Sequence, residues 1–145
     1  MNPTQKAVRL FGNGLNCSQA ILTAFGEPYG IDPEKAKILG RPWGGGLGRL
    51  GQICGAVTGA IALLGVAQRP ARDENEARND LYAAVQELVR RFEKRNGTSV
   101  CRELLGADFN TAEGRKLIKE ESLVKKFCPK FVEDAGVILE ELLQD

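Results

Sequence analysis

Residues 44–65, GGGLGRLGQICGAVTGAIALLG, place a glycine-rich loop directly before an apolar segment. Ordered glycine is costly, by about 0.5–1 kcal/mol relative to alanine inside a helix. The loop therefore predicts either turns with positive φ or a close approach of bare backbone to a ligand. The segment from about residue 52 to 68 is apolar on nearly every side, which predicts a central buried helix.

Three glycines of this stretch, Gly51, Gly55 and Gly59, recur at intervals of four residues. Residues four apart share one face of a helix, so this face would carry no side chains. Close packing of a second helix is the interpretation that we adopt for it. The same face could also pair two helices across a homodimer.

Helix signals continue along the rest of the chain, as capping residues, prolines at first positions and glycines just past the ends. The predicted helices start after Asn2, Asn16, Asp32, Asp73, Thr98 or Ser99, Asn110 and Cys128. No alternating strand pattern is present. We therefore expect one all-α domain over residues 1–145, a bundle of six to eight helices around the central helix at about 52–68.

Composition narrows the class of protein. The 145 residues carry 20 basic and 19 acidic side chains, a net charge of +1, and no basic stripe typical of a nucleic-acid-binding protein. The most hydrophobic stretch, residues 53–67, is shorter than the ~20 residues of a membrane span. The N-terminus resembles no signal peptide. We expect a cytoplasmic protein that is not an integral membrane protein and binds no nucleic acid.

Four cysteines and the absence of histidine direct attention to sulfur chemistry. Without histidine, Ser-His-Asp and Cys-His machinery is excluded. No CxxC pair occurs, so neither a zinc ribbon nor a thioredoxin motif is present. Any shared site must be assembled by the fold from four separate segments. Its candidate residues are Cys17, Cys54, Cys101 and Cys128.

All four cysteines fall near predicted helix N-termini, and Cys128 could itself be an N-cap before Pro129. Free backbone amides and the helix dipole stabilise an anion there, and cysteine pKa values can fall from about 8.5 into the range of roughly 3.5–7.5. The alternative is that these cysteines are small buried apolar residues. Position alone does not separate the two interpretations.

For Cys54 we expect a lowered pKa and a substantial thiolate population near neutral pH. Helix-start amides, glycine-loop amides and the flanking Arg41 and Arg49 would all lower it, whereas burial against Ile53 and Val57 would raise it. We expect the loop to leave one side of the thiol open. The predicted anion- or ligand-binding loop consists of Gly44, Gly45, Gly46, Gly48, Arg49 and Gly51. Its GxGxxG match lacks the preceding strand of a dinucleotide site.

Residues 54–59, CGAVTG, match a CGAxxG motif, and the chain resembles the C_GCAxxG_C_C family, which is named after its four cysteines. The resemblance covers nearly the whole chain. The matching segments are Asn16–Ala20, Gly44–Arg49, Cys101–Gly106 and Cys128–Pro129. It implies a small protein whose redox activity is inferred from the cysteines and whose gene tends to lie beside transporter genes. No substrate comes with it.

Three functions therefore stay open. The first is a redox-active protein that exchanges thiols and disulfides or transfers electrons, with Cys54 as thiolate, Cys17 as resolving partner, and Cys101 and Cys128 as a second pair or auxiliary thiols. The second is a module whose four cysteines hold zinc or an iron–sulfur cluster. The third is a transporter-associated accessory protein that carries a soft ion. Whether the protein is an enzyme, and whether its partner is a redox protein or a transporter component, does not follow from the sequence.

Overall fold

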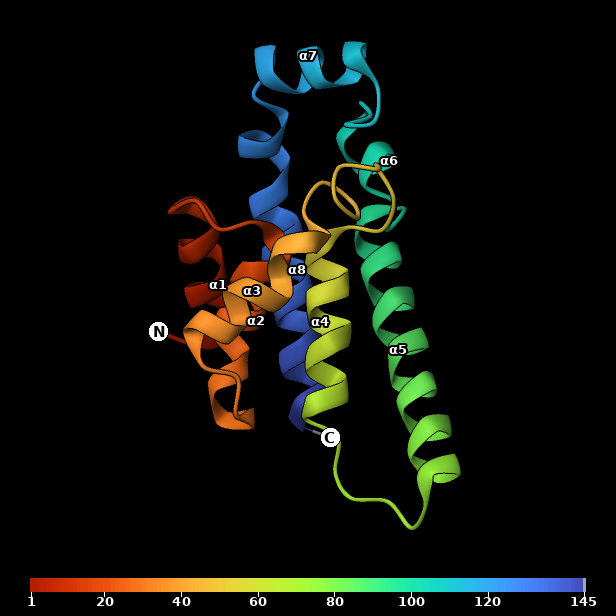
Figure 1. The fold of residues 1–145 in the computed structure, drawn as a ribbon. Coiled ribbons are helices and arrows are strands. Elements are labelled where there is room, and N and C mark those ends of the chain that lie inside the picture. Colours follow the sequence, from red (N-terminus) through yellow and green to blue (C-terminus); the bar gives the residue numbers. More distant parts are fainter. Residues whose placement is uncertain (145) are drawn as a thin grey trace.

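The computed structural model describes residues 1–144, and helices dominate this part of the chain (Figure 1). The α-helices are α1 (Pro3–Gly12), α2 (Cys17–Gly26), α3 (Pro33–Gly40), α4 (Gly55–Val66), α5 (Glu74–Asn96), α6 (Cys101–Leu105), α7 (Ala112–Glu120) and α8 (Leu123–Gln144). Two 3₁₀ helices, η1 (Glu27–Tyr29) and η2 (Arg41–Trp43), flank α3. The prediction of an all-α fold with six to eight helices is confirmed.

Local capping explains where most helices begin. The Asn2 and Asn16 side chains accept hydrogen bonds from the amides of Gln5 and Gln19, whose side chains bond back to the capping residues. Such reciprocal boxes satisfy amides that would otherwise lack an intrahelical partner. Asp32 and Asp73 cap α3 and α5 in the same way with their carboxylates. These four starts agree with the prediction.

The core lies where α4 packs against α2, α5 and α8, and Figure 1 shows α4 between α2 and α5. A Cβ at Gly59 would lie 3.1 Å from the Ser18 carbonyl oxygen of α2, and one at Gly55 would lie 3.3 Å from the Cys17 Cβ. The small-residue face of α4 is thus covered by α2, which confirms the packing interpretation for these two glycines. Among the helices described, none has the length and apolar composition of a membrane span.

The central helix is shorter than predicted, because residues 52–54 are extended and pair with a distant segment. Ile53 and Val100 form an isolated antiparallel bridge. The Cys54 amide donates to the Ser99 carbonyl at 2.8 Å, and the Cys101 amide donates to the carbonyl of Gln52. Residues 52–54, which were expected to belong to the helix, are therefore held by hydrogen bonds to residues 99–101 of the same chain. These bonds join the start of α4 to the start of α6.

The last helix begins earlier than predicted. α8 starts at Leu123, so Pro129 lies inside it and Cys128 is not an N-cap. An internal proline removes one helical hydrogen bond and costs roughly 3 kcal/mol. The turns before it bring Leu123 and Val124 against the core, and this burial offsets the cost. A smaller correction concerns α7, which is capped by Thr111 rather than Asn110.

Candidate functional site

All four cysteines line one cleft of about 820 Å³ at the end of the bundle where α4 begins. Its walls come from the N-terminal ends of α2 and α4, the glycine loop, α6, and the first half of α8. The prediction that the cysteines converge despite their separation in sequence is confirmed. In this structure all four are free thiols.

Each cysteine is positioned by a particular element. Cys54 is the N-cap of α4, and Cys17 and Cys101 are the first residues of α2 and α6. These three occupy the helix starts that the sequence predicted. Cys128 does not, because it lies within α8 beside Pro129. Its place in the cleft comes from the face of α8 that it occupies.

The glycine loop forms a short left-handed spiral. Residues 45–49 all have φ between +56° and +69°, including the non-glycine residues Leu47 and Arg49. Left-handed backbone costs about 1–2 kcal/mol for each non-glycine residue. A Cβ at Gly46 would lie 2.7 Å from the Cys101 Cβ and 2.6 Å from the Gln52 amide nitrogen. The loop therefore needs glycine both for its backbone angles and for its close contact with Cys101.

Cys54 and Cys17 affect each other's pKa in opposite directions. The Cys17 thiol, which can donate toward the Cys54 sulfur, is the main influence that lowers the pKa of Cys54. Burial opposes this shift, whereas the amides of Ala56 and Val57 lower the pKa further, although neither makes a regular capping hydrogen bond. Contacts with Cys128 and Cys54 raise the pKa of Cys17 well above its ordinary value. Of the two sulfurs, Cys54 is therefore the one that loses its proton more readily, and Cys17 the one that retains it.

Cys101 differs from Cys54 although both begin helices. Burial, followed by the nearby Cys54 and Cys128 sulfurs and Asp108, raises its pKa to about 12. Desolvation thus exceeds the favourable effect of a helix start in this one-and-a-half-turn helix. Cys101 is a neutral thiol at physiological pH.

The expected influence of Arg41 and Arg49 on Cys54 is not found, and neither is that of the glycine-loop amides. The lowered pKa of Cys54 has its causes in Cys17 and in the first turn of α4. The cleft also leaves Cys54 less open than predicted, since only 5% of its surface is exposed. Cys17 is the most accessible of the four cysteines.

The predicted ligand loop is largely, though not wholly, part of the cleft. Gly44, Gly45, Gly46, Gly48 and Arg49 line it. Gly51 does not, because it packs against Asp108 and Arg102.

Sequence reasoning missed Lys119 and Lys125, which also line the cleft. Their segment mixes basic, acidic and apolar residues and gives no local signal. Only the course of α7 and α8 brings them there.

The side-chain arrangement also bears on metal binding. In the part of the chain that the structure describes, no group of three or more His, Cys, Asp or Glu side chains is placed to hold a metal ion.

The fold and the cleft define an all-helical protein with four cysteines gathered from distant segments around a glycine loop. The chain belongs to the C_GCAxxG_C_C family, described as "Putative redox-active protein (C_GCAxxG_C_C)", whose model matches residues 15–142. No curated protein and no solved structure matches it.

Proposed function

We propose that this protein is a thiol–disulfide redox protein in which Cys54 is the attacking thiolate and Cys17 the resolving thiol. The observation that carries the proposal is that Cys17 and Cys54 meet in one cleft at the starts of α2 and α4. Their contact lowers the pKa of Cys54 and raises that of Cys17. The reactive species in exchange is the thiolate. A neighbouring thiol is what must complete the reaction.

The reaction conserves electrons and protons. The Cys54 thiolate attacks one sulfur of a substrate disulfide, so that a mixed disulfide forms and one substrate thiolate leaves. Cys17 then loses its proton and attacks the Cys54 sulfur, releasing the second substrate thiol and leaving a Cys17–Cys54 disulfide. The substrate gains two electrons from the protein, and its two leaving thiolates take up one proton lost by Cys17 and one from the solvent. An external thiol or dithiol returns the protein to its reduced form.

Cys128 and Cys101 take auxiliary roles in this proposal. Cys17 contacts Cys128 as well as Cys54. After losing its proton, Cys128 can attack Cys17 in the oxidised protein, so that a Cys17–Cys128 disulfide replaces the Cys17–Cys54 disulfide and the Cys54 thiolate is released. Cys101 stays neutral and serves to enclose the site.

The test is the alkylation rate of reduced, metal-free protein at pH 7, followed by mass spectrometry of quenched samples. One thiol should react faster than a free cysteine peptide, and Cys54→Ser should abolish that phase while the helical circular dichroism is retained. Oxidation should remove two thiols reversibly and link Cys17 to Cys54. If Cys54 reacts only after unfolding, the proposed mechanism is wrong.

Elemental analysis of protein purified without oxygen separates this function from the zinc or iron–sulfur alternative. Stoichiometric metal with no free thiols would establish a metal-binding module. Absence of metal, together with the reversible loss of two thiols, is the outcome that we expect.

A further inference from the structure

The charged side chains that line the cysteine cleft are all of one sign. Arg41 and Arg49 come from η2 and the glycine loop, and Lys119 and Lys125 come from α7 and α8. No aspartate or glutamate is among the residues that line the cleft. In a chain with 20 basic and 19 acidic residues, this separation makes the cleft a local region of positive potential.

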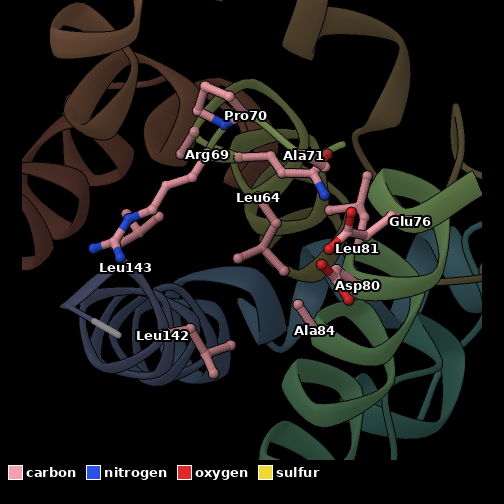
Figure 2. Close-up of a pocket in the computed structure, with 12 residues that line it drawn as sticks. Leu64, Arg69, Pro70, Ala71, Glu76, Asp80, Leu81, Ala84, Leu142 and Leu143 are labelled. Carbon is pink, nitrogen blue, oxygen red and sulfur yellow. The ribbon is translucent and has the colours of Figure 1, made fainter. Parts of the chain in front are cut away.

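These four cations are also free of ion pairs. Among the described residues, none of them lies within 4.0 Å of a carboxylate, whereas Arg72, Arg91 and Lys130 elsewhere do. A second cavity, of about 270 Å³, gives a useful contrast (Figure 2). It lies at the far end of α4, and Arg69 shares its lining with two acids, Glu76 and Asp80. Unbalanced positive charge is thus a property of the cysteine cleft.

Apart from these four cations, the lining of the cleft is largely apolar. Phe11, Leu15, Leu104, Phe109 and Phe131 contribute to its walls. Its volume of about 820 Å³ lies in the range of roughly 300–1,000 Å³ that holds ligands of several hundred daltons. A lone small inorganic anion would leave most of this space and all of the apolar wall unused.

The depth of the sulfurs distinguishes between small and large substrates. Cys54 and Cys128 are only 5% and 8% exposed. A disulfide on the surface of a folded protein cannot be brought into line with so recessed a sulfur. A small molecule that enters the cleft can be.

We propose that the substrate is a low-molecular-weight disulfide bearing carboxylates, whose negative groups bind the four cations while its sulfur–sulfur bond reaches Cys54. This inference rests on the proposed exchange function and adds to it the chemical class of the substrate. The reaction is the two-electron exchange given above. The anionic disulfide is reduced to two thiols, and Cys17 and Cys54 are oxidised to a disulfide.

Three disulfides of matched size test the inference: 3,3′-dithiodipropionate, which is anionic, 2-hydroxyethyl disulfide, which is neutral, and cystamine, which is cationic. Each is mixed with the fully reduced chain at pH 7, and the second-order rate of Cys54 modification is divided by the rate of a small free thiol. The anionic reagent should exceed the neutral one at least about tenfold, and the preference should shrink as salt is added.

Substitutions of the cleft cations test whether these residues cause the preference for the anionic disulfide. Arg49→Gln combined with Lys125→Gln should lower the rate with the anionic disulfide several-fold more than the rate with the neutral one. Arg78→Gln is the matched control, because Arg78 is an exposed cation on α5 that is not among the cleft residues and pairs with Glu74. It should change neither rate. Circular dichroism confirms that each variant is folded.

The outcomes separate the two proposals. A fast Cys54 phase with equal normalised rates for all three reagents would overturn the substrate class and leave the exchange function standing. A preference that persists in the double variant would also overturn it, because the cations would then not be its source. No fast phase with any reagent would mean that the exchange function itself is wrong.

Discussion

At the N-cap of α4 a cysteine stands where serine, threonine, aspartate or asparagine is usual. Cys54 makes no regular capping hydrogen bond, so its presence does not improve the start of the helix. A thiolate at this place is nonetheless stabilised by the amides of Ala56 and Val57. Cys54 is therefore better explained as a sulfur whose thiolate the helix start stabilises than as a residue that caps the helix. Cys54→Ser should accordingly leave the fold intact.

The first residue-scale prediction concerns the partner of Cys54. Cys17→Ala removes the thiol that most strongly lowers the pKa of Cys54, so this pKa should rise and alkylation at pH 7 should slow about tenfold, the size of a hydrogen bond to a charged group. Alkylation rates measured from pH 5 to 10 give the midpoint directly.

Cys17→Ser is the matched control for this prediction. Its hydroxyl still donates toward Cys54, so the midpoint should stay nearer to that of the native protein. Equal midpoints for the alanine and serine variants would show that Cys17 acts through packing alone.

At the scale of elements, the contact between α2 and α4 is governed by glycine. A methyl group at Gly59 would lie 3.1 Å from the Ser18 carbonyl oxygen and 3.2 Å from the Ile21 Cβ, so α2 would have to move. Gly59→Ala should lower the free energy of unfolding by about 1–3 kcal/mol, the usual cost of overpacking. Urea denaturation followed by circular dichroism measures the change.

Gly65 supplies the comparison within the same helix. A Cβ there would meet nothing within 4 Å. Gly65→Ala should therefore stabilise the protein by about 0.5–1 kcal/mol through the lower conformational entropy of the unfolded chain. Two substitutions of opposite sign in one helix would establish that contact with α2, and not helix propensity, decides the role of Gly59. Two stabilising results would contradict this packing.

The elements that the sequence predicts well are those fixed by local chemistry. Asn16 and Asp73 have their capping partners three residues away, and Gly97 ends α5 with φ of +83°. What the sequence could not give depends on distant partners. Gln52 and Cys54 are held outside α4 because residues near Cys101 pair with them. Pro129 is tolerated inside α8 because Leu123 and Val124, in the turn at the start of this helix, pack against the core.

The candidate site shows the same division. The cysteines and most of the glycine loop could be named from their motifs. The lowering of the Cys54 pKa could also be predicted from the sequence. The cause of that shift could not, because Cys17 lies 37 residues earlier and only folding brings its thiol to Cys54. The cleft residues Lys119 and Lys125 belong to α7 and α8, and no local sequence pattern predicts the path of these two helices.

At the scale of the whole molecule, the buried thiols should make the free energy of unfolding fall as the pH rises through the alkaline range. A raised folded-state pKa contributes stability that is fully present below the unfolded pKa and is lost as the pH rises through the folded value. For Cys101 the window runs from about 8.5 in the unfolded chain to about 12 in the folded protein. In this window its contribution should fall by about 1.4 kcal/mol per pH unit.

The measurement is urea denaturation at pH 8 and pH 10 in the presence of a reductant, for the native chain and for Cys101→Ala. Cys101→Ala lacks this titration, so its free energy of unfolding should fall less steeply with pH than that of the native chain. Other groups titrate in the same range, and the difference between the two slopes isolates Cys101. Parallel slopes would contradict the raised pKa.

The spiral at residues 45–49 has a further consequence that concerns chirality. A run of backbone at φ near +60° is the conformation that D-amino acids prefer, and natural residues enter it only under strain. In a protein otherwise made of right-handed helices, the wall beside the reactive sulfurs is thus a small piece of the enantiomeric helix. Glycine, which has no handedness, is the residue that ribosomal synthesis can supply for such a shape, and this accounts for its abundance there.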